Sequence, residues 1–374
     1  MRPPNTIDFL RGVALLEILV NHVPGNALSR FTHRQYGWSD AAEVLIFLAG
    51  FALALRGGAR KSARASLREE WLRAGNIYVW HVLFTFLLIA VYFTACRLGD
   101  PGILAENGTQ RIDGATIAGV FLLSHQLRYF DILPVYIAMA LVSPLALKLA
   151  RDYGVFTLLL ASFAMYFCAR LAGFDAPNWP QSGQWYFNPF VWQFMFVLGF
   201  VCGHARAAGA ALAGSRFVFG AAACLLVVSA LAMLAGVPNQ DVAVRGGLEA
   251  ALWDKGDLGP MRIVHFLALA LVFARLSGPA SDWIARRAPW TWTSVSTLGR
   301  YSLHTFCTAA LLSALGQIAH RAGLHGLAFD TAFFVASMAL LLAFVHFARA
   351  RRLRAAPPRA RTAEASSSSM SLAP

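Results

Sequence analysis

The sequence predicts an all-α, polytopic integral membrane protein, and three observations support this fold class. Hydrophobic residues make up 57% of the 374 residues and charged residues only 14%, which differs from the average composition of soluble domains. Apolar runs of bilayer length recur along the whole chain. No internal repeat, glycine-rich phosphate loop or stretch with the composition of a soluble domain is present. One transmembrane domain over residues 1–350 therefore accounts for nearly all of the chain.

About ten segments have the apolarity and length of transmembrane helices, which need about 20 mostly apolar residues. In chain order they cover residues 7–25, 40–56, 77–97, 131–149, 154–173, 188–205, 216–236, 261–277, 298–319 and 327–348. A further apolar stretch, 112–124, has only thirteen residues. It is short for a crossing, so we expect a re-entrant or interfacial helix there. If that stretch does cross, the two termini lie on opposite faces.

The distribution of positive charge predicts the orientation of these helices. The chain has a formal net charge of +13 at pH 7, and Lys and Arg concentrate in the segments 56–73 and 349–361. With ten spans, both segments lie on the same side as the N-terminus, which is the positive-inside pattern. We therefore expect cytoplasmic N- and C-termini and a disordered, basic and Ser-rich cytoplasmic tail over 351–374. Because topology explains the basic excess, no nucleic-acid partner is expected.

The N-terminal segment and the cysteines exclude several other classes. Asp8 and Arg11 interrupt the first apolar stretch, so we do not expect a cleavable signal peptide. All five cysteines lie in or at the ends of apolar spans and have neither disulfide nor zinc spacing. We therefore expect no metal and no permanently bound cofactor.

The first span carries a stripe of ionisable residues. Eleven positions separate Arg11 from His22, which is three helical turns plus about 20° and places both side chains on one face, about 16 Å apart along the axis. Asp8 falls on the same face, one turn before Arg11. Ionisable groups are costly at bilayer depth, so this face is expected to meet protein or a water-filled cavity.

These residue types have the chemistry for group transfer. With a cytoplasmic N-terminus, Arg11 lies toward the cytoplasm, whereas His22 and Glu43, in the first turn of the second span, lie at a similar depth on the far side. A carboxylate neighbour fixes the tautomer of a histidine and stabilises its protonated form, which suits a general base for a hydroxyl nucleophile. The Arg11 guanidinium suits a phosphate or carboxylate. Together they suggest transfer from a charged cytoplasmic donor to a hydroxyl acceptor.

Two other interpretations fit the same spacing. Asp8 and Arg11 can form a structural ion pair within the membrane, with His22 as an interfacial residue bonded to Asn21 or to a loop. A proton-coupled transporter also uses buried histidines and carboxylates, as a proton relay. Spacing alone does not separate these alternatives from an enzyme.

Several runs of residues resemble a known family. The run Ile7–Ala14, followed by His22, resembles the opening of the acyltransferase-3 superfamily, whose mark is an Arg and a His separated by ten residues, and the run Asp40–Gly50 is similar to its second helix. Within this superfamily the closer match is the OpgC family, which modifies osmoregulated periplasmic glucans with succinyl groups. The supporting runs follow in order over nearly the whole chain: 131–136 (DILPVY), 185–193 (WYFNPFVWQ), 254–262 (DKGDLGPMR), 265–267 (HFL) and 298–303 (LGRYSL).

The resemblance implies a multi-pass O-acyltransferase of the bacterial inner membrane. It implies acyl-CoA as the donor substrate, with succinyl-CoA favoured, and a periplasmic glucan as acceptor; acetylation of another surface carbohydrate is the alternative. His22 would act as general base or transient acyl carrier, oriented by Glu43, with Asp8 and Arg11 completing the catalytic group and Arg11 contacting the donor. A transporter without transferase chemistry and a structural subunit of a glucan-synthesis complex are the other classes considered.

Further polar residues are candidates for substrate binding. Lys255, Arg262 and His265 open the eighth span on the outer side, where a cation can neutralise a succinyl carboxylate or a developing oxyanion. Alternatively, Lys255 and Arg262 are interfacial anchors whose charged ends reach water. Trp185 and Asn188 belong to an aromatic, amide-bearing segment on which a sugar can stack, and which also has the composition of a membrane-interface belt. Three residues complete the set, either as cavity-facing groups or as satisfied structural ones: Asp40, Asp131 and His81.

Overall fold

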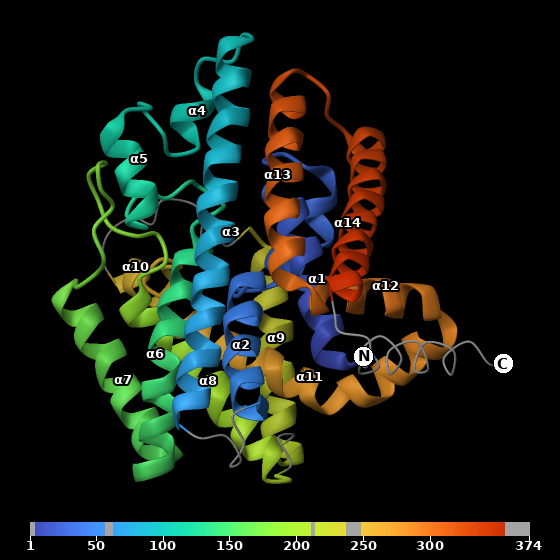
Figure 1. The fold of residues 1–374 in the computed structure, drawn as a ribbon. Helices are drawn as coiled ribbons and strands as arrows, with labels where there is room; N and C mark the ends of the chain where they lie inside the picture. The colour runs from blue at the N-terminus through green and yellow to red at the C-terminus, as the bar shows by residue number, and fades with distance from the viewer. Residues whose placement is uncertain (1–3, 57–62, 211–213, 237–247, 356–374) are drawn as a thin grey trace.

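The computed structural model describes residues 4–56, 63–210, 214–236 and 248–355, and the fold across these ranges is helical (Figure 1). Two short 3-10 helices, η1 (Ala27–Phe31) and η2 (His33–Tyr36), connect the first two α-helices. The α-helices are α1 (Thr6–Asn21), α2 (Ala41–Arg56), α3 (Ala63–Arg97), α4 (Ile103–Glu106), α5 (Gly114–Phe121), α6 (Ile132–Tyr153), α7 (Val155–Ala172), α8 (Pro189–Ala207), α9 (Arg216–Leu234), α10 (Leu248–Trp253), α11 (Pro260–Arg287), α12 (Pro289–Arg300), α13 (Ser302–Arg321) and α14 (Leu327–Ala355).

Each of the ten segments predicted to span the membrane contains a helix. Within the described ranges, eight helices are long and apolar enough to cross a membrane, namely α3, α6, α7, α8, α9, α11, α13 and α14. Helices α1 and α2 have 16 residues each, or about 24 Å, which is shorter than a hydrocarbon core of about 30 Å. The multi-pass helical architecture is therefore confirmed, whereas ten crossings with both termini cytoplasmic stay a prediction.

Several short helices lie between the predicted spans, and two of them, α5 and α12, bear on the predicted topology. The stretch 112–124 contains only α5, whose eight residues begin where the Asp113 carboxylate accepts the backbone N–H of Thr116 at 2.8 Å. A helix of that length is about 12 Å long, which confirms that the stretch is short for a crossing. Helix α12 was not expected from the sequence: it follows α11 directly, with Pro289 in its first turn.

Glycines allow two pairs of helices to approach backbone to backbone. Gly12 of α1 lies against the backbone of α12, and Gly299 of α12 lies against the backbone of α1. Gly50 of α2 and Gly199 of α8 form the corresponding contact between those two helices. A Cβ atom at any of these positions would overlap a carbonyl group of the neighbouring helix. Small residues at such crossings are typical of packed membrane helices.

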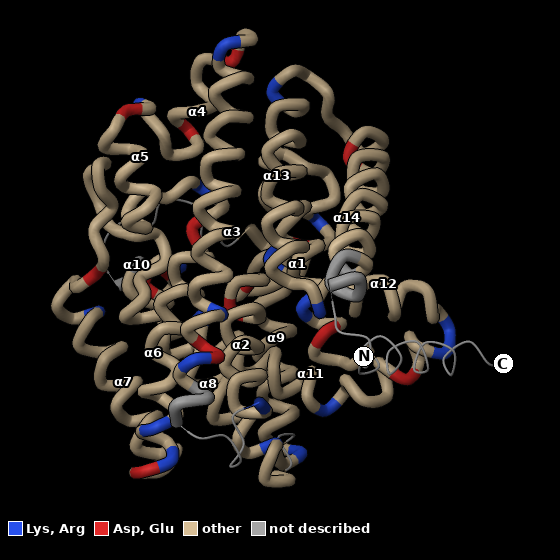
Figure 2. Tube along the Cα trace, viewed as in Figure 1, with Lys and Arg blue, Asp and Glu red and all other residues tan. Residues whose placement is uncertain are grey.

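Charged residues lie at both ends of the bundle and also at mid-height (Figure 2). The end of the bundle at which α2, α6 and α8 begin lies about half-way up the view, because α3 and α13 continue past it (Figure 1). We call it the His22 end, because His22 directly follows α1. The main apolar core packs between α2, α3, α6 and α8 below this end. The helix termini and loops that meet at the His22 end build the candidate site.

Candidate functional site

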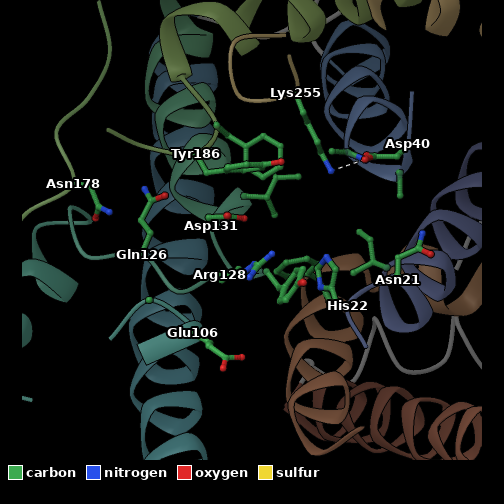
Figure 3. A pocket seen from close by; sticks show the side chains of 18 of the residues that line it. Asn21, His22, Asp40, Glu106, Gln126, Arg128, Asp131, Asn178, Tyr186 and Lys255 are labelled. Carbon is green, nitrogen blue, oxygen red and sulfur yellow. Dashed lines mark hydrogen bonds and ion pairs between the residues drawn. The ribbon is translucent and has the colours of Figure 1, made fainter. Parts of the chain in front are cut away.

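A cavity of about 640 Å³ lies at the His22 end of the bundle (Figure 3). Cavities of this size are typical of small-molecule sites. Its walls come from the end of α1, the loop before α2, the loops around α4 and before α6, the segment 178–187 and the turn before α11. The polar side chains labelled in Figure 3 are Asn21, His22, Asp40, Glu106, Gln126, Arg128, Asp131, Asn178, Tyr186 and Lys255.

His22 is held in place from both its backbone and its ring. The backbone N–H of His22 donates to the Ile18 carbonyl at 3.0 Å, and the backbone carbonyl of His22 accepts from Gln317 Nε2 at 2.8 Å. The imidazole packs against the Tyr129 ring at an interplanar angle of 35°, with 4.8 Å between the ring centroids. Its Nδ1 is buried, and no described residue forms a hydrogen bond to it. The imidazole is thus fixed while one of its nitrogens is not engaged by the protein.

Tyr129 adopts a backbone conformation that is rare for a bulky residue. Its φ of 68° lies in the left-handed region. The flanking backbone is tied down, because the Arg128 N–H donates to the Asn107 carbonyl at 3.2 Å and the Phe130 N–H donates to the Leu127 carbonyl at 3.0 Å. Strained residues of this kind cluster at functional sites and persist only where the surrounding structure holds them. Tyr129, which has this strained backbone, provides the ring against which the His22 imidazole packs.

Two carboxylates and two cations form a buried cluster beside the cavity. Lys255 Nζ lies 2.5 Å from Asp40 Oδ2, the pair marked in Figure 3. Arg262 Nη2 lies 2.5 Å from Glu43 Oε1 and 3.6 Å from Asp40 Oδ2. The side chains of Arg262 and Glu43 are fully buried, whereas Lys255 lines the cavity. Burial lowers the pKa of Lys255, but the Asp40 carboxylate and Tyr186 together raise it overall, so the ammonium stays charged.

The predicted pair of His22 and Glu43 is not formed. Glu43 Oε1 accepts from Arg262 Nε at 2.6 Å, and Glu43 Oε2 accepts from the Asp40 N–H at 2.9 Å. Both carboxylate oxygens are therefore engaged within the charged cluster. A guanidinium forms stronger, charge-assisted bonds to a carboxylate than a neutral imidazole does. The prediction that Glu43 orients His22 is wrong, and the position of Glu43 is explained by neutralisation of Arg262.

Asp8 and Arg11 lie toward the other end of α1. Arg11 Nη2 donates to the Leu48 carbonyl of α2 at 2.6 Å. Asp8 Oδ2 lies 3.6 Å from Arg300 Nε of α12. Neither residue lines the cavity. The stripe predicted on α1 thus connects two separate environments, and catalytic roles for Asp8 and Arg11 stay predictions.

Two predicted substrate-binding residues, His265 and Asn188, lie outside the cavity lining and form hydrogen bonds within the scaffold. His265 Nδ1 lies 2.8 Å from Ser39 Oγ, and its Nε2 lies 3.1 Å from Ser229 Oγ, so both ring nitrogens are engaged. The Asn188 side chain accepts the N–H of Phe190 at 3.0 Å and caps α8. Neither residue lines the cavity. Their hydrogen bonds account for their burial as parts of the scaffold.

Of three further candidates, only Asp131 lines the cavity, directly before α6. Trp185 lies in the loop before α8, where its backbone N–H donates to the Ala176 carbonyl at 2.9 Å. His81 is fully buried within α3 and stacks on Phe130 at 5.5 Å between ring centroids. Its two nitrogens have no hydrogen-bond partner among the described residues. The structure therefore brings Asp131, but not Trp185 or His81, to the cavity of His22.

The cavity also contains residues that the sequence analysis missed. Arg34, Gln126, Arg128 and Tyr129 all line it. The available signal was the polar and aromatic run directly before the span that begins near Asp131, on the same side as His22. No group of three or more His, Cys, Asp or Glu side chains in the described part of the chain is arranged to hold a metal ion.

The fold and the cavity together define a class of protein, namely a multi-pass helical membrane protein with a polar cavity at one end of its bundle. The family model described as OpgC protein matches residues 4–352, so the chain belongs to the OpgC family. This membership, together with the apolar helices, supports a role as a membrane acyltransferase. No curated protein and no solved structure matches the chain.

Proposed function

We propose that this protein is an O-acyltransferase of the bacterial inner membrane that transfers a succinyl group from cytoplasmic acyl-CoA to a hydroxyl of a periplasmic glucan. The observation that carries the proposal is the imidazole of His22, which is fixed in a polar cavity with a buried nitrogen that no described residue engages. Membership of the OpgC family supports the acyltransferase class. The spacing of Arg11 and His22 supports a place in the acyltransferase-3 superfamily.

In the proposed reaction, His22 accepts the proton of a sugar hydroxyl while the hydroxyl oxygen attacks the thioester carbonyl. The tetrahedral intermediate collapses with loss of the coenzyme A thiolate, which takes the proton from the imidazolium. A positioned base contributes about 10²–10⁴-fold to such a step, and orientation of the two reactants contributes more. The same geometry serves a two-step route, in which a ring nitrogen of His22 accepts the acyl group before the sugar hydroxyl displaces it.

Lys255 is placed to stabilise the negative charge that develops on the thioester oxygen. Its ammonium has three N–H donors, and Asp40 pairs with the ammonium on one side. Lys255 lines the same cavity as His22. The turn that carries it is fixed by the indole N–H of Trp192, which donates to the Gly256 carbonyl at 2.8 Å. A cation held in place before the reaction stabilises the transition state without reorganisation.

The remainder of the wall suits a carbohydrate acceptor. Gln126, Asn178 and Tyr186 present amide and phenol groups that can both donate and accept hydrogen bonds. Arg11, at the opposite end of α1, is proposed to contact the charged donor from the cytoplasmic side, because its guanidinium suits phosphate and carboxylate groups. The acyl group stays bonded to coenzyme A, so the thioester end of the donor has to reach about 16 Å along α1 to His22 in the cavity.

The test is mass spectrometry of periplasmic glucans from a strain that lacks the gene, complemented with wild-type protein or with a His22→Ala variant. His204→Ala is the matched control, because His204 is an exposed histidine near the end of α8 away from the cavity. We expect succinyl groups with the wild type and with His204→Ala only. Equal succinylation by His22→Ala would refute the role of the imidazole. Absence of succinyl groups even with the wild type would refute glucan succinylation and favour another acceptor or a transporter, which does not consume acyl-CoA.

A further inference from the structure

The cations at the cavity differ in how their charge is compensated. Lys255 is paired with Asp40 at 2.5 Å. Arg128 is an exposed residue of the cavity wall, and no carboxylate within the described ranges forms an ion pair with it. Its guanidinium lies over the Tyr129 ring, 5.1 Å from the ring centroid. Arg128 therefore presents a positive charge that is accessible to an anionic ligand in the cavity.

Two carboxylates of the cavity wall, Glu106 and Asp131, form no ion pair with Arg128 among the described residues. Glu106, on the same wall, accepts from Arg321 Nη1 at 2.7 Å. Asp131 is three residues further along the chain and also lines the cavity, but it forms no ion pair with Arg128. From the sequence, Lys255 or Arg262 is the predicted partner of an acyl carboxylate. In the structure Lys255 is paired with Asp40, and Arg262 is fully buried.

The position of Arg128 relative to His22 is fixed through one aromatic ring. The Tyr129 ring lies 4.8 Å from the His22 ring and 5.1 Å from the Arg128 guanidinium carbon, which keeps these two groups within about 10 Å of each other. Both side chains line the cavity, and Figure 3 shows them on the same side of it. The left-handed backbone of Tyr129 and the bond from the Arg128 N–H to the Asn107 carbonyl hold this arrangement.

The upper limit of about 10 Å between His22 and Arg128 accommodates a four-carbon dicarboxylic acyl group. A reacting carbonyl must lie about 3–3.5 Å from the catalytic nitrogen or from the nucleophile that it activates. Three carbon–carbon bonds place the second carboxyl carbon about 4 Å further on, and a charge-assisted bond adds about 2.8 Å to the guanidinium nitrogen. Together these steps come to about 10 Å for an extended acyl chain, so such a chain is long enough to reach from His22 to Arg128. An acetyl group has no second carboxylate and leaves the guanidinium without a partner.

We propose that Arg128 binds the distal carboxylate of a succinyl-type acyl group and thereby selects anionic over neutral acyl donors. This inference rests on the function proposed above and adds the residue that determines the acyl specificity. A planar guanidinium can hold the carboxylate through two parallel hydrogen bonds, which fixes both the position and the orientation of the acyl chain. The thioester carbonyl at the other end of the chain is then directed toward His22.

The experiment compares kcat/KM for succinyl-CoA and acetyl-CoA in purified, membrane-reconstituted protein. Arg128→Gln should lower the succinyl-to-acetyl ratio by about 10–100-fold, the effect of losing a hydrogen-bonded charged partner. Arg128→Lys should lower it less, because it keeps the charge without the planar fork. Arg111→Gln is the matched control at an exposed arginine that does not line the cavity, and it should keep the wild-type ratio.

A second measurement does not depend on turnover. Free succinate should raise the unfolding temperature of the wild type and of Arg111→Gln, but not that of Arg128→Gln, and acetate should raise none of them. An unchanged donor ratio in Arg128→Gln, or equal stabilisation of it by succinate, would overturn the role of Arg128. Absence of transfer from either donor by the wild-type protein would instead overturn the proposed function, and this inference with it.

Discussion

Replacement of Glu43 by glutamine should destabilise the protein strongly, because it leaves a buried guanidinium with an incomplete partner. Arg262 and Glu43 have no exposed side-chain surface, and Arg262 Nη2 lies 2.5 Å from Glu43 Oε1. Removing one partner of a buried ion pair costs about 3–5 kcal/mol. Asp40 remains 3.6 Å from Arg262 Nη2 and compensates in part. We therefore expect Glu43→Gln to lower the free energy of unfolding by about 3 kcal/mol, the lower end of that range.

The loss can be measured by reversible denaturation in detergent, followed by the fluorescence of the ten tryptophans. Asp152→Asn is the matched control, because its pair with Lys148 at 3.7 Å is exposed and should contribute less than about 1 kcal/mol. The double variant Glu43→Gln with Arg262→Met should recover stability, since it removes the buried guanidinium that Glu43→Gln leaves without its carboxylate. A loss below about 1 kcal/mol for Glu43→Gln, or no recovery in the double variant, would refute this reasoning. Full stability combined with lost acyl transfer would instead return Glu43 to the catalytic group.

Two other predictions concern packing and the cavity charge. Gly299→Ala should destabilise the protein by about 1–3 kcal/mol or more, because the new methyl group overlaps the carbonyl of Asp8. The control Gly220→Ala has open space around the new methyl group and should not destabilise the protein. Thermal unfolding of the two variants tests this prediction. Lys255→Met should lower acyl transfer through loss of the oxyanion partner. Burial lowers the pKa of Lys255, but Asp40 and Tyr186 together raise it overall, so the stabilisation from the Lys255–Asp40 pair should persist through neutral pH and be lost only above the ordinary lysine pKa. Unfolding of the wild type and of Lys255→Met, measured against pH, tests this.

The predictable part of the fold follows from hydropathy. Segments such as 131–149 and 188–205 are apolar enough to be recognised as spans, and α6 and α8 occupy them. Helix α12 escaped prediction because its twelve residues mix Thr, Ser and Trp and are too short for a span. Its helical state depends on contact with α1, which local sequence does not encode.

The site was only partly predictable, because its partners are distant in sequence. The spacing on α1 identified His22, and the turn before α11 identified Lys255. The partner of Glu43 is 219 residues away, and its choice depends on how α2 and α11 are rotated against each other. Arg128 lies in an irregular loop whose left-handed residue Tyr129 turns it toward the cavity, and no periodic pattern reports such a conformation.

The most direct test of the central claim is acyl transfer by purified protein in liposomes, with succinyl-CoA on one side and an unmodified glucan on the other. The wild type should form succinylated glucan and release coenzyme A in equal amounts. His22→Ala should retain the wild-type unfolding temperature and lose about 10²–10⁴-fold in rate. A folded His22→Ala protein that transfers succinyl groups at the wild-type rate would contradict the account.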